Sequence, residues 1–70
     1  MSSYSWWSPD FMHEYYVLRI SNRETAGYAI YDEKGKRVDN NRQFADGYET
    51  AEEAQAALDS MAAERGWVKA

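Results

Sequence analysis

Histidine, cysteine and facing carboxylates supply most acid–base, nucleophilic and metal chemistry in proteins, and this sequence offers few of them. It contains one histidine, His13, and no cysteine, which excludes a two-histidine zinc site, a thiolate metal site and a pair of histidines acting as acid and base. Two carboxylate pairs, Asp32 with Glu33 and Glu52 with Glu53, lie where a turn and the start of a helix are expected. We therefore expect a protein that is not an enzyme and that binds no metal or cofactor.

Residue alternation predicts the strands that position these side chains. The segment Glu14–Ser21 is rich in β-branched and aromatic residues and alternates with period two, which is typical of a strand, and Tyr15 is expected to face outward. The segment Gly27–Asp32 predicts a second strand, and the following turn, Asp32–Gly35, has a glycine available for a positive φ. A short third strand is expected at Lys36–Asp39.

The spacing further along predicts a helix that begins after Thr50 and ends before Gly66. Thr50 and Glu53 have the spacing of a capping box, and Gly66 is placed to end the helix, with Trp67 packing back on it. An apolar stripe at helical spacing is formed by Ala54, Ala57, Leu58, Met61 and Ala62. The fold class is therefore α+β: a three-stranded antiparallel sheet packed on one C-terminal helix.

The first thirteen residues have neither a strand nor a helix period, and they hold three large apolar rings, Trp6, Trp7 and Phe11. Leaving such rings in water is unfavourable, so we expect part of this aromatic N-terminal arm to fold back over the rest. The expected organisation is an arm over residues 1–13 and a single β-β-β-α domain over residues 14–70.

The junction before the helix carries a family resemblance. It reads Gly47-Tyr48-Glu49-Thr50-Ala51-Glu52-Glu53-Ala54 and resembles the junction in arm-type DNA-binding domains of phage and transposon integrases, with a likeness that extends over about residues 16–63. The resemblance implies a three-stranded sheet that enters a helix, and a sheet face, rich in Lys and Arg, that enters the major groove of DNA. The candidate contacts to DNA are Arg19, Arg23, Lys36, Arg37 and Arg42.

The charge balance does not favour nucleic acid as a partner. Lys and Arg number 8 against 12 Asp and Glu, which gives a net charge of −4. Residues 14–42, which include the expected sheet, hold six basic and five acidic side chains. Because phosphates attract proteins mainly through clustered Lys and Arg, we expect no direct binding to nucleic acid.

Size and charge carry a second resemblance. A chain of 70 residues with a net charge of −4, no cysteine and many aromatics is similar to the inhibitors that phages and plasmids carry against host defences, of which anti-CRISPR proteins are the best-known group. The resemblance implies a partner that is a protein or a ribonucleoprotein complex. No apolar run is long enough to span a membrane, and the lack of cysteine fits a reducing compartment, so a cytoplasmic location is expected.

Two groups of side chains are candidates for binding that partner. The acidic group is Glu49, Glu52, Glu53 and Asp59, in a segment where acids outnumber bases by six to one between Asp46 and Arg65. It either attracts a basic groove as a line of phosphates would, or it is only a solvated helix face.

The aromatic group is Trp6, Trp7, Phe11 and Tyr15. Because Trp and Tyr are enriched at interface hot spots, these rings either form an interaction surface, which a homodimer could also use, or cover the sheet as a second small core. The sequence thus predicts a non-catalytic protein-binding module, an inhibitor that occludes a nucleic-acid-binding surface of a host defence complex. The alternative is a small DNA-binding domain of the integrase-arm kind.

Overall fold

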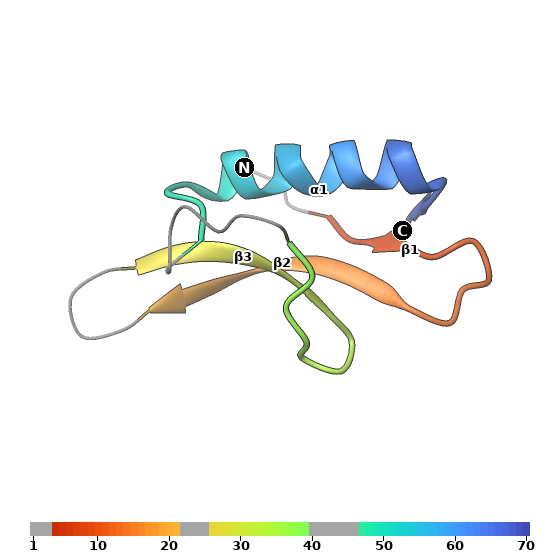
Figure 1. The fold of residues 1–70 in the computed structure, drawn as a ribbon, viewed down its shortest axis with the longest axis horizontal. Helices are drawn as coiled ribbons and strands as arrows, with labels where there is room; N and C mark the ends of the chain where they lie inside the picture. Colours follow the sequence, from red (N-terminus) through yellow and green to blue (C-terminus); the bar gives the residue numbers. More distant parts are fainter. Residues whose placement is uncertain (1–3, 22–25, 40–46) are drawn as a thin grey trace.

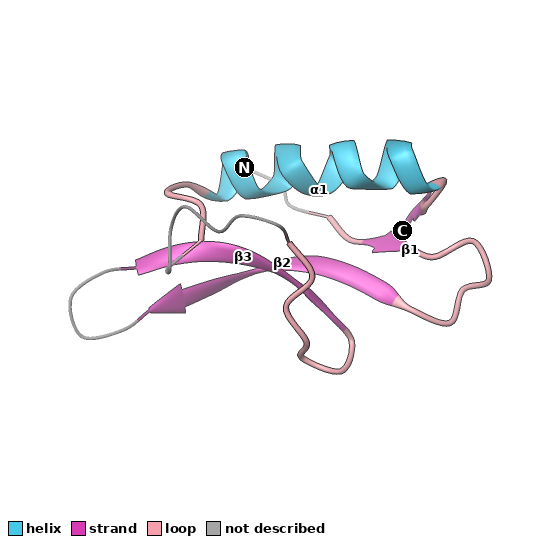
Figure 2. Cartoon of the chain, viewed as in Figure 1, coloured by secondary structure: helices cyan, strands magenta, loops and turns pink. Residues whose placement is uncertain are grey.

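The computed structural model describes the chain in three stretches, residues 4–21, 26–39 and 47–70. The elements are, in chain order, β1 (Trp6–Trp7), β2 (Glu14–Ser21), β3 (Ala26–Asp32), α1 (Ala51–Arg65) and β4 (Val68–Lys69). They form two layers, with α1 lying along one side of an antiparallel sheet (Figures 1 and 2). The expected α+β class, with one C-terminal helix on an antiparallel sheet, is confirmed.

The sheet has the strand order β3-β2-β1-β4, so the arm adds β1 beside β2 and the C-terminus adds β4 beside β1. Trp6 pairs with Tyr15 on one side and with Lys69 on the other, and the Ala70 amide donates to the Ser5 carbonyl. The expected return of the arm is confirmed. The arm contributes β1 to the same sheet as the rest, and the expected boundary at residue 13 falls between β1 and β2.

The expected third strand, Lys36–Asp39, is reduced to one bridge, in which Arg37 lies opposite Tyr31. The Val38 amide donates to the Ile30 carbonyl at 2.9 Å, but the next backbone contact is replaced by a side chain, because Oδ2 of Asp39 accepts from the Ile30 amide at 3.1 Å. Main-chain pairing between this segment and β3 therefore ends at Val38. Phe44, in the loop that follows, lies outside the described residues.

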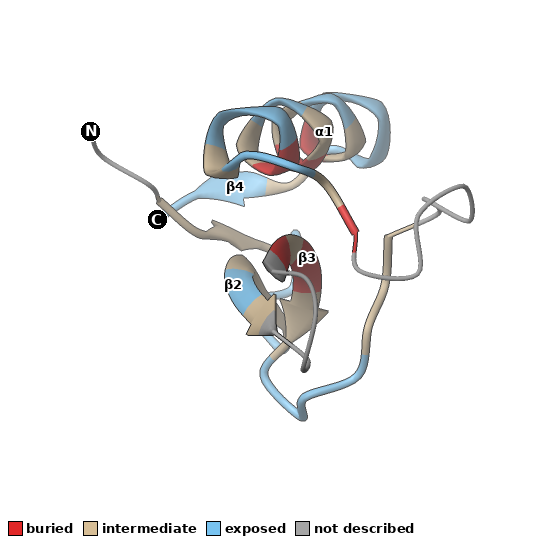
Figure 3. Cartoon of the chain, turned by 90° about the vertical axis from the view of Figure 1, so that its left-hand side faces the viewer, coloured by how far each residue is buried: buried red, intermediate tan, exposed pale blue. Residues whose placement is uncertain are grey.

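The helix begins and ends where its capping residues place it. Thr50 Oγ1 accepts from the Glu53 amide at 3.1 Å, and Gly66 adopts a left-handed conformation with φ 73° and donates its amide to the Ala62 carbonyl. The apolar stripe faces the sheet: Ala54, Leu58 and Ala62 are buried, as is Ile30 of β3 (Figure 3). Within the described stretches the helix is too short and too polar to cross a bilayer.

The register decides which side of the sheet each residue occupies, because directly opposite residues in an antiparallel pair share a side. Trp6 donates its indole Nε1–H to Oδ1 of Asp59 on α1 at 2.9 Å, which places Trp6 on the side that faces the helix. Its partner Tyr15 shares that side and stacks on Trp67 with ring centroids 3.9 Å apart. The expectation that Tyr15 faces outward is therefore wrong.

Candidate interaction surface

The side of the sheet turned away from α1, here called the open face, carries a row of large side chains. In register, it is made by Val68, Trp7, Glu14, Tyr16, Tyr31, Leu18, Ile20 and Ala29, of which Ala29 is fully buried. Leu18 and Val68 are 43% and 41% exposed, and the rings of Trp7, Tyr16 and Tyr31 are half-buried. Among the described residues, no helix covers this side (Figure 1). Exposed apolar side chains on one face of a sheet commonly mark an interaction site when they form a continuous patch.

The loop between β1 and β2 extends this surface at one end. Phe11 is 60% exposed, lies 6.5 Å from the Trp7 ring, and has a positive φ of 59°, which is uncommon for an aromatic residue. The loop is held by hydrogen bonds around buried Ser8, whose amide donates to the His13 carbonyl and whose carbonyl accepts from the Phe11 amide. Asp10 accepts from the Ser8 hydroxyl and the Met12 amide. The exposed ring is thus presented by an ordered loop.

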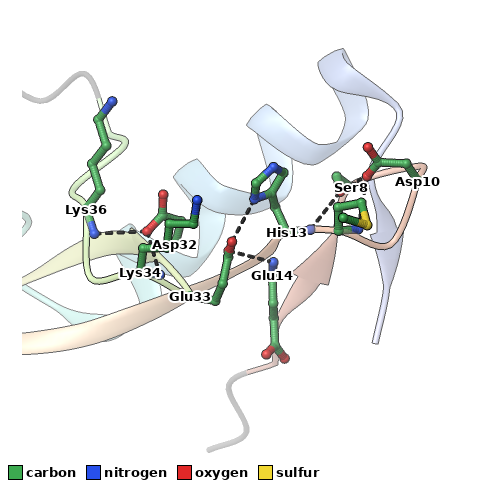
Figure 4. A network of polar contacts seen from close by, with 9 residues as sticks. Ser8, Asp10, His13, Glu14, Asp32, Glu33, Lys34 and Lys36 are labelled. Atoms are coloured by element: carbon green, nitrogen blue, oxygen red, sulfur yellow. Dashed lines mark hydrogen bonds and ion pairs between the residues drawn. The ribbon is translucent and has the colours of Figure 1, made fainter.

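A polar network joins this loop to the turn after β3 (Figure 4). Oε1 of Glu33 pairs with Nδ1 of His13 at 2.7 Å, and Oε2 accepts from the Glu14 amide at 3.2 Å. These hydrogen bonds, that of His13 first, hold the pKa of Glu33 below its usual value. The Glu14 side chain points away from the His13 ring, toward the open face (Figure 4), and its Oε2 accepts from the Ser5 hydroxyl at 2.7 Å. The sole histidine is therefore a partner of Glu33 in an exposed hydrogen bond.

The helix side holds the other two predicted aromatic contacts, Tyr15, which stacks on Trp67, and Trp6, which lies in a cluster centred on Asp59. The Asp59 carboxylate accepts from Trp6, from the Tyr4 hydroxyl at 2.8 Å and from Nε2 of Gln55 at 3.0 Å. Burial raises the pKa of Asp59, but the hydrogen bonds from Gln55, Trp6 and Tyr4 outweigh it and bring the pKa below its usual value. Asp59 thus binds the arm to the helix, and it lies apart from the exposed acids.

Asp59→Asn is expected to lower the free energy of unfolding by about 1–2 kcal/mol at pH 7, because hydrogen bonds to a charged acceptor are replaced by weaker ones. The lowered pKa gives the sign of the pH dependence: the stabilisation by Asp59 is present above the pKa of the unfolded state, roughly 4, and is lost as pH falls through the lower folded pKa. Urea titrations should show the gap between variant and wild type shrink in acid. Glu64→Gln, at an exposed helix position, is the control and should change stability by less than about 0.5 kcal/mol.

The remaining acidic candidates, Glu49, Glu52 and Glu53, are all exposed around the start of α1. Glu52 and Glu53 lie in the first helical turn, where negative charge also interacts favourably with the helix dipole. The structure therefore brings three of the four predicted carboxylates together at one end of the helix, and it gives two of them a role in helix stability as well.

The basic candidates for DNA binding do not gather on one face. Arg19 is exposed and lies on the helix side in register, opposite Tyr28, and Lys36 is exposed in the turn after β3. Arg37 is in register with the open face, opposite Tyr31, but its Nε donates to Oδ2 of Asp39 at 2.8 Å. Arg23 and Arg42 lie outside the described residues. Within β1 to β4 as described, the open face carries no lysine or arginine.

The sequence reasoning named Trp7 but missed other large side chains of the open face: Val68, Glu14, Tyr16, Tyr31 and Leu18. Alternation puts Tyr16 and Leu18 on the side of β2 opposite to Tyr15, as the structure has them, but nothing in the alternation says which side meets the helix. The available signal was Arg19 on the side of Tyr15, which suggested that this side faces water. In the structure, Arg19 is exposed near the end of β2, beyond the buried centre of that side.

In the described stretches, no group of three or more His, Cys, Asp or Glu side chains could hold a metal ion. The surface is instead built of aromatic rings, apolar side chains and single carboxylates, a composition that suits contact with another macromolecule. Comparison with known proteins gives no relative: no protein-family model, no curated protein and no solved structure matches this chain.

Proposed function

We propose that this chain is a non-catalytic protein-binding module that uses the open face as its contact surface. The observation that carries the proposal is the row of rings and aliphatic side chains on a sheet side that no described helix covers, with Leu18 43% exposed in the middle of β2. The core of a protein interface is enriched in Trp, Tyr and Phe, and the open face with its adjoining loop offers Trp7, Tyr16 and Phe11.

The charge of the chain indicates the kind of partner. A net charge of −4, with exposed Glu49, Glu52 and Glu53 grouped at one end of α1, attracts a basic surface from a distance. Basic protein surfaces commonly bind nucleic acid, so a module of this charge would compete for such a surface. We extend the proposal accordingly to an inhibitor that occludes a nucleic-acid-binding surface of a host defence complex.

The arrangement of the cations supports this function over direct binding to DNA. In the integrase-arm resemblance, the sheet face that enters the groove is rich in Lys and Arg. Here the corresponding face presents rings, Leu18 and the carboxylate of Glu14, and Arg37 at its margin is paired with Asp39. A carboxylate facing the phosphates would oppose binding to duplex DNA.

Leu18→Glu tests the proposed contact surface. A charge in the centre of a desolvated interface is expected to weaken binding at least about tenfold, which corresponds to a loss of about 1.4 kcal/mol. The tagged chain would be used to capture proteins from a host lysate, and the dissociation constant of each captured protein would then be measured with purified components. Addition of the chain should also displace nucleic acid from the partner.

The matched control is Ala63→Glu, which introduces the same charge at an exposed position of α1. It should leave the dissociation constant within about twofold of the wild-type value. Circular dichroism would verify that both variants are folded. Equal affinities for wild type, Leu18→Glu and Ala63→Glu would contradict the use of the open face.

A further inference from the structure

The open face has one position where a charged group lies between two aromatic rings. Glu14 is directly opposite Trp7 across the β1–β2 pair, and it is two residues from Tyr16 along β2, so all three side chains leave the same side of the sheet. Oε2 of Glu14 accepts from the Ser5 hydroxyl, which orients the carboxylate, and Oε1 makes no hydrogen bond with the described residues. One oxygen of the carboxylate is therefore available beside two rings.

Two other rings of the described chain, those of Tyr4 and Trp67, already have a cation beside them. The Lys69 ammonium lies 4.1 Å from the centroid of Tyr4, and the Arg65 guanidinium lies 5.4 Å from that of Trp67, whose other neighbour is Tyr15. Trp7 and Tyr16 have no such cation among the described residues. The fold thus gives Tyr4 and Trp67 an internal cation and leaves Trp7 and Tyr16 on the open face without one among the described residues.

We propose that the Trp7–Glu14–Tyr16 site binds an arginine side chain of a partner protein. A guanidinium is planar and weakly hydrated, so it stacks on aromatic rings, and it donates hydrogen bonds to a carboxylate at the same time. A lysine ammonium is a compact, strongly hydrated charge that gains less from such a site. This inference rests on the proposed function, because it names the side chain that the open face recognises.

Charge complementarity supports this occupant. The chain carries a net charge of −4, Glu33 lies next to the Glu14 amide, and the strands of the open face contribute no lysine or arginine within the described residues. A cationic segment would therefore be attracted to this end of the sheet. The same charges oppose a second copy of this chain and oppose nucleic acid as the occupant.

The test uses the full chain, labelled with ¹⁵N, and two peptide probes, nona-arginine and nona-lysine, at about 50 mM NaCl to limit screening. The three tryptophans report on three different places: Trp6 is bonded to Asp59, Trp67 is stacked on Tyr15, and Trp7 lies on the open face. Nona-arginine should shift the indole signal of Trp7 and the amide signals of β2, while the indole signals of Trp6 and Trp67 stay in place. Nona-lysine should bind more weakly, by about threefold or more.

Glu14→Gln should raise the dissociation constant for nona-arginine by about fivefold, because it removes the charge and retains an oxygen that can accept from Ser5. Glu53→Gln, which removes an exposed carboxylate of α1, should change it by less than about twofold. If Glu14→Gln proves unstable, the shifts of the NMR signals of the wild-type chain with the two peptides test the inference.

Three results would overturn the inference: equal affinity for the two peptides, the largest shifts at Glu49 to Glu53, or no shift at millimolar peptide. Each of them leaves the proposed function standing, because Leu18→Glu tests that function with a whole partner protein. If instead Leu18→Glu leaves partner binding unchanged while Trp7 still responds to nona-arginine, the proposed function fails and the arginine site remains.

Discussion

Gly47→Ala is expected to lower the free energy of unfolding by about 3 kcal/mol, which is most of the roughly 3–5 kcal/mol that a core of this size supplies. Gly47 has a φ of 83°, and a Cβ added to it would overlap the carbonyl oxygen of Tyr28. That oxygen cannot move away freely, because it accepts from the Tyr48 amide at 2.7 Å while the Tyr28 amide donates to the Tyr48 carbonyl at 2.9 Å. The substitution therefore breaks the contact that joins the start of the helix to β3.

The control for this prediction is Gly35→Ala. Gly35 has nearly the same φ, 80°, but an added Cβ would meet nothing within 4 Å. Gly35→Ala should therefore lower the free energy of unfolding by only about 1 kcal/mol, which is the cost of a side chain on a residue in the left-handed conformation. Thermal and urea unfolding followed by circular dichroism would measure both variants. Equal losses at the two positions would show that the close approach of Gly47 to Tyr28 does not contribute to stability.

Asp39→Ala is expected to lower the free energy of unfolding by about 3 kcal/mol, through the loss of a buried carboxylate that several donors share. The Asp39 side chain is 1% exposed. It accepts from the Ile30 amide at 3.1 Å and from two guanidinium nitrogens of Arg37 at 2.8 and 3.1 Å, and the bond to Asp39 raises the pKa of Arg37. Its removal deprives the Ile30 amide of its acceptor at the edge of β3 and leaves a half-buried cation without this counterion.

A double variant separates these two effects. Arg37→Met combined with Asp39→Ala removes the ion pair as a unit, so its loss should be smaller than the sum of the two single losses by about 1–2 kcal/mol. Urea unfolding of the wild type, the two single variants and the double variant gives that coupling energy. Strictly additive losses would mean that the pair contributes no net interaction, and that Asp39 acts through its other donors, of which the Ile30 amide is one.

These contacts also bear on how the chain meets a partner. The outer edge of β3 is occupied at Tyr28 by Tyr48, at the Ile30 amide by Asp39 and at the Asp32 amide by the Lys36 carbonyl, 3.0 Å away. An edge whose groups are bonded in this way does not accept an added strand. The other edge, β4, is only two residues long. Recognition through a sheet face is therefore favoured over recognition by strand addition.

Local sequence determined the elements whose signals lie within a few neighbouring residues of the chain. The helix could be predicted with both ends because Thr50, Glu53 and Gly66 act within one turn of each end. The strand Glu14–Ser21 was predicted with its observed bounds, because alternation over eight residues is a strong signal. The strands β1 and β4 were not predicted, because two residues carry no periodicity and each strand exists only through its pairing with a distant segment.

The surface could be predicted by type but not by position. The sequence alone determined that this protein is small, acidic and rich in rings, and that β2 has two sides with different residues. Only the tertiary structure decided which side meets the helix, because alternation is symmetric and the choice depends on contacts more than forty residues apart, such as Trp6 with Asp59 and Tyr15 with Trp67. Those contacts turned Trp6 and Tyr15 toward the helix, and they left Trp7, Glu14 and Tyr16 on the open face.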